Sequence, residues 1–307
     1  MRICVELPEF RKAWQRLSEC HNDAGRDNNP LNMRLLGVSG VGKTFLLREY
    51  RNAFPPVLED EVTTIPVLYM SIPSAPTRKS LYAAFLKGLG VDPGQGTTEA
   101  YQRRITRLCD ECQVEFVFVD EIHHFIDRGK AHSYATAADA LKELLDMISR
   151  PFILSGAPRS RILFDHNSQL RSRVMATLHL MPFNLEQLGS LMGYLHALTE
   201  ELSEDQRQWL ASPDVATRIF FATDGVHRNV ATWVKLVLIR AKIDGFVDYT
   251  QFADIFRTRI WSPARDADNP FSQHFVMRRL NRDGEPFQPT YLDGDNHNVF
   301  PLRVAQA

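Results

Sequence analysis

One eight-residue segment restricts the fold of this chain more than any other feature. The segment Gly37–Thr44, with the sequence GVSGVGKT, matches the pattern G-x-x-x-x-G-K-[ST] in full. Apolar residues precede it at 33–36 and follow it at 45–47, which indicates a strand before the loop and a helix after it. Strand–loop–helix units of this kind belong to parallel sheets covered by helices. We therefore expect an α/β protein with a phosphate-binding loop.

The residue types of the loop explain how it would hold a nucleotide. Glycines let consecutive backbone N–H groups turn inward around a β-phosphate, and the helix that begins near Lys43 adds the positive end of its dipole. The ammonium of Lys43 would reach the β- and γ-phosphates, and the hydroxyl of Thr44 would bind Mg²⁺. The predicted ATP-binding residues of this segment are Gly37, Ser39, Gly40, Val41, Gly42, Lys43, Thr44 and Phe45.

Two carboxylates follow a second apolar run. Residues 116–119 read Phe-Val-Phe-Val, and Asp120 and Glu121 come directly after them. Asp120, at the carboxyl end of a strand, would complete the Mg²⁺ site with Thr44. Glu121 is placed to orient and deprotonate a water that attacks the γ-phosphate. A second acid at this point favours hydrolysis of ATP over transfer of its phosphate to another molecule.

Four further residues are candidates for contacts with the γ-phosphate. Ser155 closes the apolar segment 152–154, where its hydroxyl could meet the phosphate or the water, although a serine there is also an ordinary turn former. Arg171 or Arg173 could project from one subunit into the site of another and neutralise charge in the transition state. Arg228 follows Gly225 in a helical region and could couple the nucleotide to domain closure. Each arginine could equally form a surface ion pair.

The order of apolar segments predicts the architecture. Strands expected near 33–38, 65–70, 114–119, 152–154 and 177–181 alternate with helical patterns, which indicates a doubly wound parallel sheet of five strands. Beyond Pro182 only helical patterns follow, so we expect a small all-helical C-terminal domain, or lid. The predicted division is an N-terminal helix or adapter segment over 1–30, an α/β core over 31–182, the lid over 183–260 and a proline-rich tail over 261–307. The tail is expected to be extended or partly disordered and to offer aromatic residues for docking a partner, with an ordered tail packed on its own lid as an equal alternative.

Composition excludes several classes of protein. The chain has 307 residues, with 36 lysines and arginines against 37 acidic residues and a formal net charge of −1, which argues against a globally basic nucleic-acid coat. Four cysteines are too few for a disulfide framework. We find neither a signal peptide nor an apolar run of the roughly 18 residues that a membrane span needs. We therefore expect a cytoplasmic protein without a membrane partner.

Together these motifs resemble those of AAA+ ATPases, over roughly residues 15–260. Within that superfamily the chain resembles the TniB/TnsC regulators of transposition. The likeness lies in the segments Val119-Asp120-Glu121-Ile122-His123-His124-Phe125 and Leu154-Ser155-Gly156-Ala157-Pro158, the latter followed by Leu170 and Arg173, and in 65–90 with its Pro73, Pro76, Thr77 and Leu81. Alignment to a Leu-x-x-Arg pattern favours Arg173 over Arg171 as the intersubunit arginine.

The resemblance implies a function. It implies an ATP-dependent oligomer, a ring or a helical filament, that assembles on double-stranded DNA. The oligomer would recruit a transposase to a target chosen by a TniQ-like or CRISPR-linked partner, and ATP hydrolysis would drive its disassembly. An AAA+ loader or initiator in replication or repair shares every ATPase motif and stays open as an alternative. A P-loop kinase is a third reading, against which Glu121 argues.

DNA contacts require arginine or lysine on one surface, not a basic protein as a whole. Thr98 is expected to cap a helix that carries Arg103 and Arg107 four residues apart on one face. In related regulators the DNA-facing surface falls between the phosphate loop and the acidic pair. The candidate DNA-binding residues are Arg78, Lys79, Arg103, Arg104 and Arg107.

Two other signals receive plainer interpretations. Cys109 and Cys112 have the spacing of a metal knuckle, but the four ligands of a zinc site are lacking, so a coincidental pair on a helix is expected. His123 and His124 are expected to pack or form hydrogen bonds beside the nucleotide site, with no settled role from the resemblance.

Overall fold

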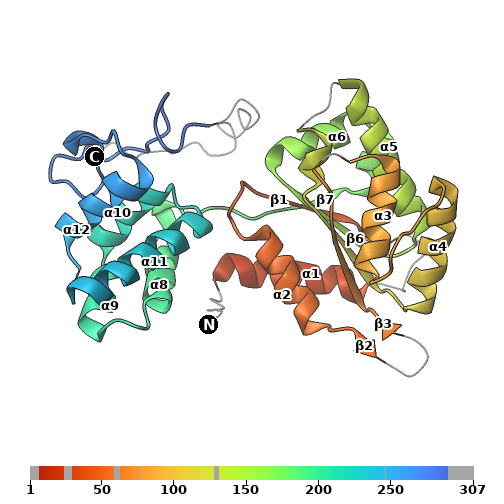
Figure 1. Ribbon diagram of the computed structural model, residues 1–307, viewed down its shortest axis with the longest axis horizontal. Coiled ribbons are helices and arrows are strands. Elements are labelled where there is room, and N and C mark those ends of the chain that lie inside the picture. The colour runs from red at the N-terminus through yellow and green to blue at the C-terminus, as the bar shows by residue number, and fades with distance from the viewer. Residues whose placement is uncertain are drawn as a thin grey trace. The chain divides into compact units, whose positions relative to one another are not determined.

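Five parallel strands form one sheet in the order β4-β5-β6-β1-β7 (Figure 1). The computed structural model describes residues 7–23, 30–58, 63–74, 76–127, 131–245 and 247–289. The prediction of a doubly wound, five-stranded parallel sheet is confirmed. The strands are β1 (Met33–Leu36), β4 (Val67–Ser71), β5 (Phe116–Asp120), β6 (Phe152–Gly156) and β7 (Ala176–His179).

The position of each strand in the sheet follows from its residues. β5 and β6 are buried at every position and, apart from Asp120 and Ser155 near their carboxyl ends, carry no polar side chain, as expected for strands covered on both faces. β4 lies at one edge and begins directly after Pro66, which lacks the N–H that an inner strand would need. β7 lies at the other edge, where its residues alternate between partly exposed and exposed. The motif-bearing strands β1, β5 and β6 are therefore neighbours at the centre.

Helices connect and cover the strands. They include α1 (Pro8–Asn22), α2 (Lys43–Ala53), α3 (Arg78–Gly88), α4 (Thr98–Glu111), α5 (Ala131–Met147), α6 (Arg161–Asp165) and α7 (Ser168–Arg173), with a two-stranded ribbon of β2 (Val57–Leu58) and β3 (Thr63–Thr64). The cap of α4 differs from the prediction by one residue. The side chain of Thr97 accepts the N–H of Ala100, and Thr98 is the first helical residue, because the capping oxygen must reach an N–H three positions ahead.

The second unit is helical, as predicted. It contains the described residues within Met1–Glu9, Gly40–Gly42 and Met181–Gly294, and the sheet belongs to the other unit. Its helices are α8 (Leu188–Leu198), α9 (Glu204–Leu210), α10 (Pro213–Thr223), α11 (His227–Asp244) and α12 (Tyr249–Ile255), and a π-helical turn follows at Phe256–Ile260. Gly225 and Arg228, which the sequence marks as candidates for coupling the nucleotide to the lid, lie within the five residues that follow α10.

The segment after residue 260 is not extended where the structure describes it. The ring of Phe271 stacks on buried Trp233 of α11, with centroids 4.7 Å apart and planes 9° from parallel. Asn269 is fully buried and donates to the carbonyl of Ala253 at 3.0 Å, while Arg218 of α10 donates to the carbonyl of Pro270 at 2.7 Å. The prolines interrupt helix formation here, but the aromatic side chains between them complete the helical core. Residues 290–307 of the predicted tail lie outside the described residues.

This packing makes Phe271 a determinant of the helical unit. We expect Phe271→Ala to lower the free energy of unfolding by about 3–5 kcal/mol, because it leaves a cavity against Trp233. Urea unfolding followed by tryptophan fluorescence measures the change. Val276→Ala, at a 61% exposed position in the same segment, is the matched control and should cost little. Equal effects of the two substitutions would show that Phe271 is not part of the core.

Candidate functional site

The phosphate loop closes around its own lysine. Lys43 begins α2 and is 7% exposed, and its Nζ donates to the carbonyls of Gly37 at 2.7 Å and Val38 at 3.1 Å. The N–H of Gly37 donates to the carbonyl of Gly156, which ties the loop to strand β6. A cationic group is thus held inside the turn where the sequence pattern places phosphate oxygens. Entry of a phosphate would exchange these neutral acceptors for a charged one.

The tip of the loop requires glycine. Gly40 has φ of +86°, in the region that favours glycine, and its carbonyl accepts the N–H of Arg228 at 3.0 Å. An added Cβ would lie 2.9 Å from Cγ1 of Val226 and 3.1 Å from Cβ of Arg228. Both observations exclude larger residues at this position. Arg228 itself lies in the first turn of α11, with an exposed side chain.

The structure brings together the two predicted magnesium ligands. Asp120, at the end of β5, is fully buried, and its Oδ2 accepts the hydroxyl of Thr44 at 2.6 Å. The same oxygen accepts the hydroxyl of Tyr69 at 3.0 Å, and Oδ1 accepts the N–H of Glu121 at 2.9 Å. Mg²⁺ in nucleotide sites is held by one or two protein oxygens together with phosphates, so a hydroxyl and a carboxylate at this separation fit that ion.

The sequence motifs did not identify Tyr69 as a residue of the site. It is the middle residue of β4, where it pairs in register with Phe118 of the acidic strand. Burial and the neighbouring Asp120 raise the pKa of its phenol to about 12, so the side chain stays a hydrogen-bond donor to the carboxylate. The sequence signal that could have identified it is a tyrosine in the strand next to the one that ends in Asp-Glu.

The backbone of Glu121 is strained, and its carboxyl group is a weaker acid than an ordinary glutamic acid. Its φ is +62° and its ψ is 35°, which is uncommon for a residue other than glycine. Burial, followed by the charge of Asp120, raises the pKa of its carboxyl group. A raised pKa makes the carboxylate a stronger base, and the strain directs this side chain away from the line of the strand. Both features suit proton abstraction from water.

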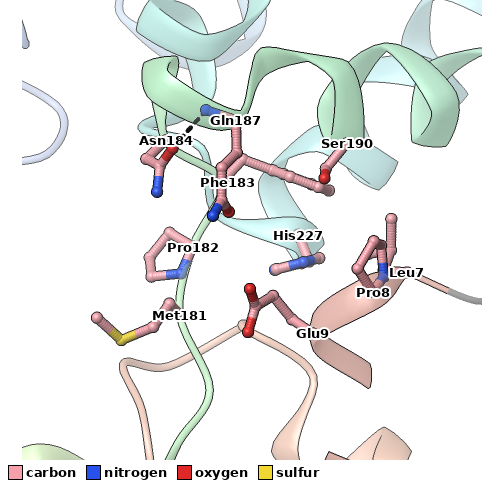
Figure 2. A pocket seen from close by; sticks show the side chains of 10 residues that line it. All are labelled: Leu7, Pro8, Glu9, Met181, Pro182, Phe183, Asn184, Gln187, Ser190 and His227. Atoms are coloured by element: carbon pink, nitrogen blue, oxygen red, sulfur yellow. Dashed lines mark hydrogen bonds between the residues drawn. The ribbon is translucent and has the colours of Figure 1, made fainter. Parts of the chain in front are cut away.

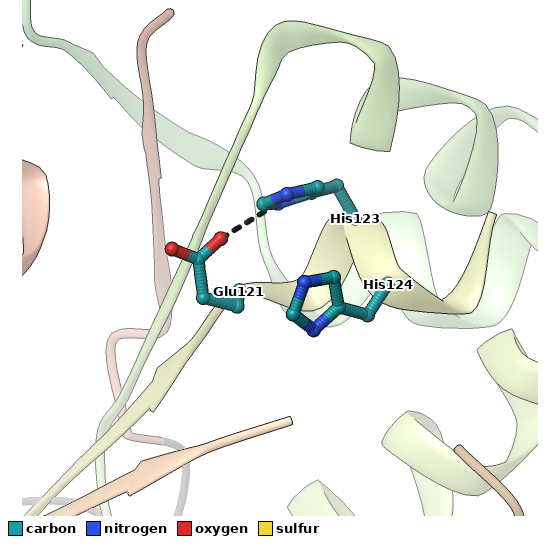
Figure 3. A group of neighbouring side chains, drawn as sticks. All are labelled: Glu121, His123 and His124. Atoms are coloured by element: carbon teal, nitrogen blue, oxygen red, sulfur yellow. Dashed lines mark ion pairs between the residues drawn. The ribbon is translucent and has the colours of Figure 1, made fainter. Parts of the chain in front are cut away.

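Two histidines adjoin Glu121 on the 3-10 helix η1 (Ile122–Phe125). Nδ1 of His123 lies 3.1 Å from Oε2 of Glu121, and Nδ1 of His124 lies 2.8 Å from the carbonyl of Ile72 (Figure 3). Burial, followed by the charge of Arg159, lowers the pKa of His123 to about 4. Its imidazole is therefore uncharged at neutral pH. Both histidines thus lie next to Glu121, and the expectation that they pack or form hydrogen bonds beside the nucleotide site stays a prediction.

Ser155 occupies a fully buried position on β6, the strand between β5 and β1. Its hydroxyl has no hydrogen-bond partner among the described residues. An unsatisfied buried hydroxyl costs about 1–3 kcal/mol, which is the kind of orphaned group that a ligand or a water would satisfy. The predicted contact of Ser155 with a phosphate or the attacking water stays a prediction.

The two arginines of α7 have different surroundings. Arg173 forms a two-point ion pair with Asp146 of α5, through Nε at 2.5 Å and Nη2 at 3.2 Å. Its Nη1 also donates to the carbonyl of Gln169 within α7. Arg171 is exposed, and its side chain has no ion pair or hydrogen bond within the described part of the chain. Arg173 thus braces α7 against α5, whereas Arg171 is available to another molecule.

The helical unit contains a small hollow that the sequence did not reveal. Its volume is about 20 Å³. The rings of His227 and Phe183 both line it, with their centroids 4.2 Å apart (Figure 2). This space accommodates about one water molecule. The lining comes from three distant stretches of sequence, so no local motif marks it. The lining residues are Leu7, Pro8, Glu9, Met181, Pro182, Phe183, Asn184, Gln187, Ser190 and His227.

The burial of His227 makes the helical unit sensitive to acid. Desolvation lowers its pKa to about 4 from an ordinary 6.5, so the unfolded chain binds more protons between these values and stability falls as pH decreases through that window. Between pH 7.5 and 5.0 we expect a loss of about 2 kcal/mol in the free energy of unfolding from this group. His227→Phe, which retains a ring against Phe183, should remove that part of the pH dependence in urea unfolding. His274→Asn, at an exposed position, is the control and should leave it unchanged.

The candidate DNA-binding side chains lie on α3 and α4 of the sheet unit, and two of them are engaged within the chain. Arg104 donates to the carbonyls of Pro93 and Asp92, and Arg78 pairs with Glu143 at 3.0 Å. Arg107 is 67% exposed and pairs loosely with Glu111, while Lys79 lies 5.8 Å from the ring centre of Tyr101. Arg103 is exposed and has no ion pair within the described ranges.

An open hollow lies beside the freest of these side chains. Its volume is about 540 Å³, and Arg103 and Arg107 line it together with Gln102, Thr106 and Met147. The one-face stripe predicted on α4 therefore contains Arg103 and Arg107. Arg104 is turned toward the loop that precedes the helix.

The cysteines show no metal or disulfide chemistry within the described residues, where Cys20, Cys109 and Cys112 are free. Burial raises the pKa of the Cys109 thiol to about 12, so it is an apolar core residue at neutral pH. Among the helices that the structure describes, none has the length and apolar character needed to cross a membrane.

Comparisons with known proteins agree with the geometry. Cdc6p from Pyrobaculum aerophilum has the same fold with a TM-score of 0.60 and 16% identity, over 86% of this chain and 70% of that one. The Aeropyrum pernix ORC2 protein, solved in ADPNP-ADP complexes, gives a TM-score of 0.57 and 17% identity, over 80% and 68% of the two chains. The chain thus shares its fold with these two proteins.

Sequence comparison identifies the family. No curated protein sequence matches the chain. A family described as "Bacterial TniB protein" matches residues 4–184, a region that includes the phosphate loop, the acidic pair, Ser155 and helix α7. This match spans more than half of the chain, and the chain belongs to the TniB family.

Proposed function

We propose that this protein is an Mg²⁺-dependent ATPase. The observation that carries the proposal is the cluster of Lys43, Thr44, Asp120 and Glu121, with Thr44 and Asp120 joined at 2.6 Å. An ammonium for phosphates, two oxygens for Mg²⁺ and a carboxylate with a raised pKa are the groups that ATP hydrolysis requires. The motif alone predicted these residue types. The 2.6 Å contact between Thr44 and Asp120 supports their convergence.

In the proposed reaction, the carboxylate of Glu121 accepts a proton from water as its oxygen attacks the γ-phosphorus. The bond to the β–γ bridging oxygen breaks, and ADP and inorganic phosphate leave. Bound Mg²⁺, held by Thr44 and Asp120, would neutralise charge on the β- and γ-phosphates. Lys43 would exchange its contacts with Gly37 and Val38 for phosphate oxygens. Ser155 would donate its unsatisfied hydroxyl to the γ-phosphate or the attacking water.

We propose that the nucleotide also engages the helical unit. Arg228 presents an exposed guanidinium next to Gly40 of the phosphate loop, so a γ-phosphate could attract it and report ATP rather than ADP. The predicted division into a core over 31–182 and a lid over 183–260 is part of this proposal.

We further propose that the ATPase is a DNA-dependent regulator of transposition. Membership of the TniB family supports this role, and the exposed guanidinium groups of Arg103 and Arg107 support contact with DNA phosphates. ATP would favour assembly of a ring or filament on double-stranded DNA, and hydrolysis would reverse it. Transposase and a TniQ-like target-selection protein are the proposed partners. Near-zero net charge means that one subunit would bind DNA weakly and that repetition along an oligomer would supply the affinity.

For the intersubunit arginine we propose Arg171. Its exposure and its lack of an ion pair or hydrogen bond among the described residues allow it to enter a neighbouring site, whereas Arg173 would first have to leave Asp146. Sequence alignment favoured Arg173, so a direct comparison of the two is informative. Arg171→Ala should reduce DNA-stimulated ATP turnover by about 1,000-fold, with unfolding unchanged. Arg173→Ala should instead lower stability and reduce turnover less.

The test of the proposed function combines assembly and turnover. With ATP, Mg²⁺ and double-stranded DNA, negative-stain microscopy should show rings or filaments, and phosphate release should rise above the DNA-free rate. Arg103→Glu with Arg107→Glu should abolish the stimulation, and Arg11→Glu with Lys12→Glu, at two exposed positions on α1, is the charge-matched control. A monodisperse monomer without turnover would contradict the proposal. Turnover and DNA binding without response to transposase or a TniQ-like protein would favour the replication or repair alternative.

A further inference from the structure

Three side chains beside the proposed catalytic water form a cluster, and only Glu121 among them has a role in the proposed hydrolysis. Glu121, His123 and His124 each offer one ligand atom, and these atoms all lie within 4.8 Å of one another (Figure 3). All three residues are partly buried. Two imidazoles and one carboxylate are the ligands of open zinc sites, with further positions left for water. Mg²⁺ prefers oxygen ligands and is a poor match for this set.

The ring of His124 is already oriented for coordination. Its Nδ1 lies 2.8 Å from the carbonyl of Ile72, and a carbonyl can only accept, so Nδ1 carries the proton. The lone pair is then on Nε2, and Figure 3 shows the other ring nitrogen facing Glu121 and His123. Histidines that bind metals commonly donate their second N–H to a backbone carbonyl, which fixes the tautomer and the ring.

His123 and Glu121 bring two ligand atoms close together. The carboxylate oxygen of Glu121 lies 3.1 Å from Nδ1 of His123, and the N–H of Ala157 points to the same nitrogen at 3.4 Å, so in the tautomer with its proton on Nε2 this nitrogen presents a lone pair to the carboxylate. The second nitrogen of the ring lies 4.0 Å from a carboxylate oxygen of Asp127, as expected for an N–H. A cation between Nδ1 and the Glu121 oxygen would satisfy both acceptors.

The backbone that carries these ligands is held firmly. Ile122 and Phe125 of the same 3-10 helix are buried, and Gly156 permits the close approach of the segment, since an added Cβ would lie 2.7 Å from Cγ1 of Ile122 and 3.4 Å from the N–H of His123. Ligands on a rigid segment lose little freedom when an ion binds.

We propose that Glu121, His123 and His124 bind a divalent transition-metal ion of the Zn²⁺ class and that this ion blocks ATP hydrolysis. A metal bond to the carboxylate occupies the lone pairs that would accept the proton of the attacking water. The inhibitory part of the proposal rests on the proposed ATPase function, whereas the binding part does not. The protein would then be held with ATP bound for as long as the ion stays.

Direct metal binding tests the site without any nucleotide. Untagged, chelator-treated full-length protein is titrated with Co²⁺, whose visible absorption reports its ligands, and Zn²⁺ should displace it at a one-to-one ratio. We expect His124→Asn, whose amide can still donate to Ile72, to weaken binding at least about 10-fold. Glu121→Gln should weaken it similarly, and His274→Asn should not change it. Circular dichroism and thermal unfolding verify that each variant is folded.

The outcomes separate the two parts of the proposal. Absence of a visible Co²⁺ spectrum, unchanged affinity in His124→Asn, or a near-ultraviolet thiolate band that marks cysteine ligands would overturn the metal site. If His123 and Glu121 share a proton and bind no metal ion, no visible Co²⁺ spectrum will appear. For the inhibitory part, micromolar Zn²⁺ in excess Mg²⁺–ATP should lower turnover at least about 10-fold in the wild type, with the same concentration dependence as binding. Binding without inhibition would overturn the regulatory role, and absence of turnover in any form would overturn the ATPase proposal while the binding result stands.

Discussion

Replacing Glu121 with glutamine should reduce ATP turnover at least about 100-fold while nucleotide binding persists. The amide is nearly the same size as the carboxylate, but it cannot accept the proton of the attacking water. Lys43, Thr44 and Asp120, which are proposed to hold ATP and Mg²⁺, are not altered. The variant should therefore accumulate the ATP-bound assembly on DNA. Phosphate release measures the first effect, and co-sedimentation with DNA measures the second.

The matched control is Glu19→Gln on helix α1, where the glutamate forms an exposed ion pair with Arg16. This substitution removes the same charge far along the sequence from the acidic strand end and should leave turnover unchanged. If Glu121→Gln retains wild-type turnover, Glu121 is not the base. Loss of ATP binding in that variant would instead indicate a structural role for the residue.

Lys43→Ala should remove nucleotide binding itself. Charge-assisted hydrogen bonds to phosphate are worth about 1.5–3 kcal/mol each, so the loss of a lysine that reaches two phosphates should weaken ATP affinity by roughly 100-fold or more. A concentration of ATP that stabilises the wild type by about 2.7 kcal/mol should then stabilise the variant by about 0.4 kcal/mol. Thermal unfolding with and without ATP–Mg²⁺ measures both values.

A lysine on the same unit supplies the control. Lys87 lies in the last turn of α3 with an exposed side chain, and Lys87→Ala should preserve the shift caused by ATP. The Lys43 variant also leaves the carbonyls of Gly37 and Val38 without their donor. Its stability without nucleotide must therefore be measured separately. An undiminished ATP shift in Lys43→Ala would contradict the assignment of the loop.

Much of the site could be predicted because its residues are local in sequence. The spacing of Gly37, Gly42 and Lys43 is itself the signature of the loop, and Asp120 follows an apolar run that could only be a central strand. In a parallel sheet the carboxyl ends of β5 and β1 lie at the same edge, and here only β6 separates the two strands. The end of β5 therefore lies near the loop that follows β1. The 2.6 Å contact of Thr44 with Asp120 follows from two short patterns and one topological rule.

What could not be predicted depends on partners distant in sequence. Nothing near Arg173 indicates that Asp146 would engage it, and nothing near Phe183 indicates that His227 would lie against it. For the tail after residue 260, the sequence left an extended chain and a segment packed on the lid equally open, because the prolines indicate the loss of helical hydrogen bonds but not which aromatic contacts compensate for it. Phe271 on Trp233 is such a contact.

The pairing of Phe271 with Trp233 also sets an order of events during synthesis. The last strand of the sheet, β7, ends at His179, so the α/β unit has all of its strands long before the ribosome reaches residue 271. The helical unit, by contrast, lacks part of its core until that residue has emerged, and domains generally fold as units in order of synthesis. During this interval the ring of Trp233, which is fully buried in the finished fold, lacks its stacking partner. A chaperone that recognises exposed aromatic surface would find the nascent chain most accessible at this stage.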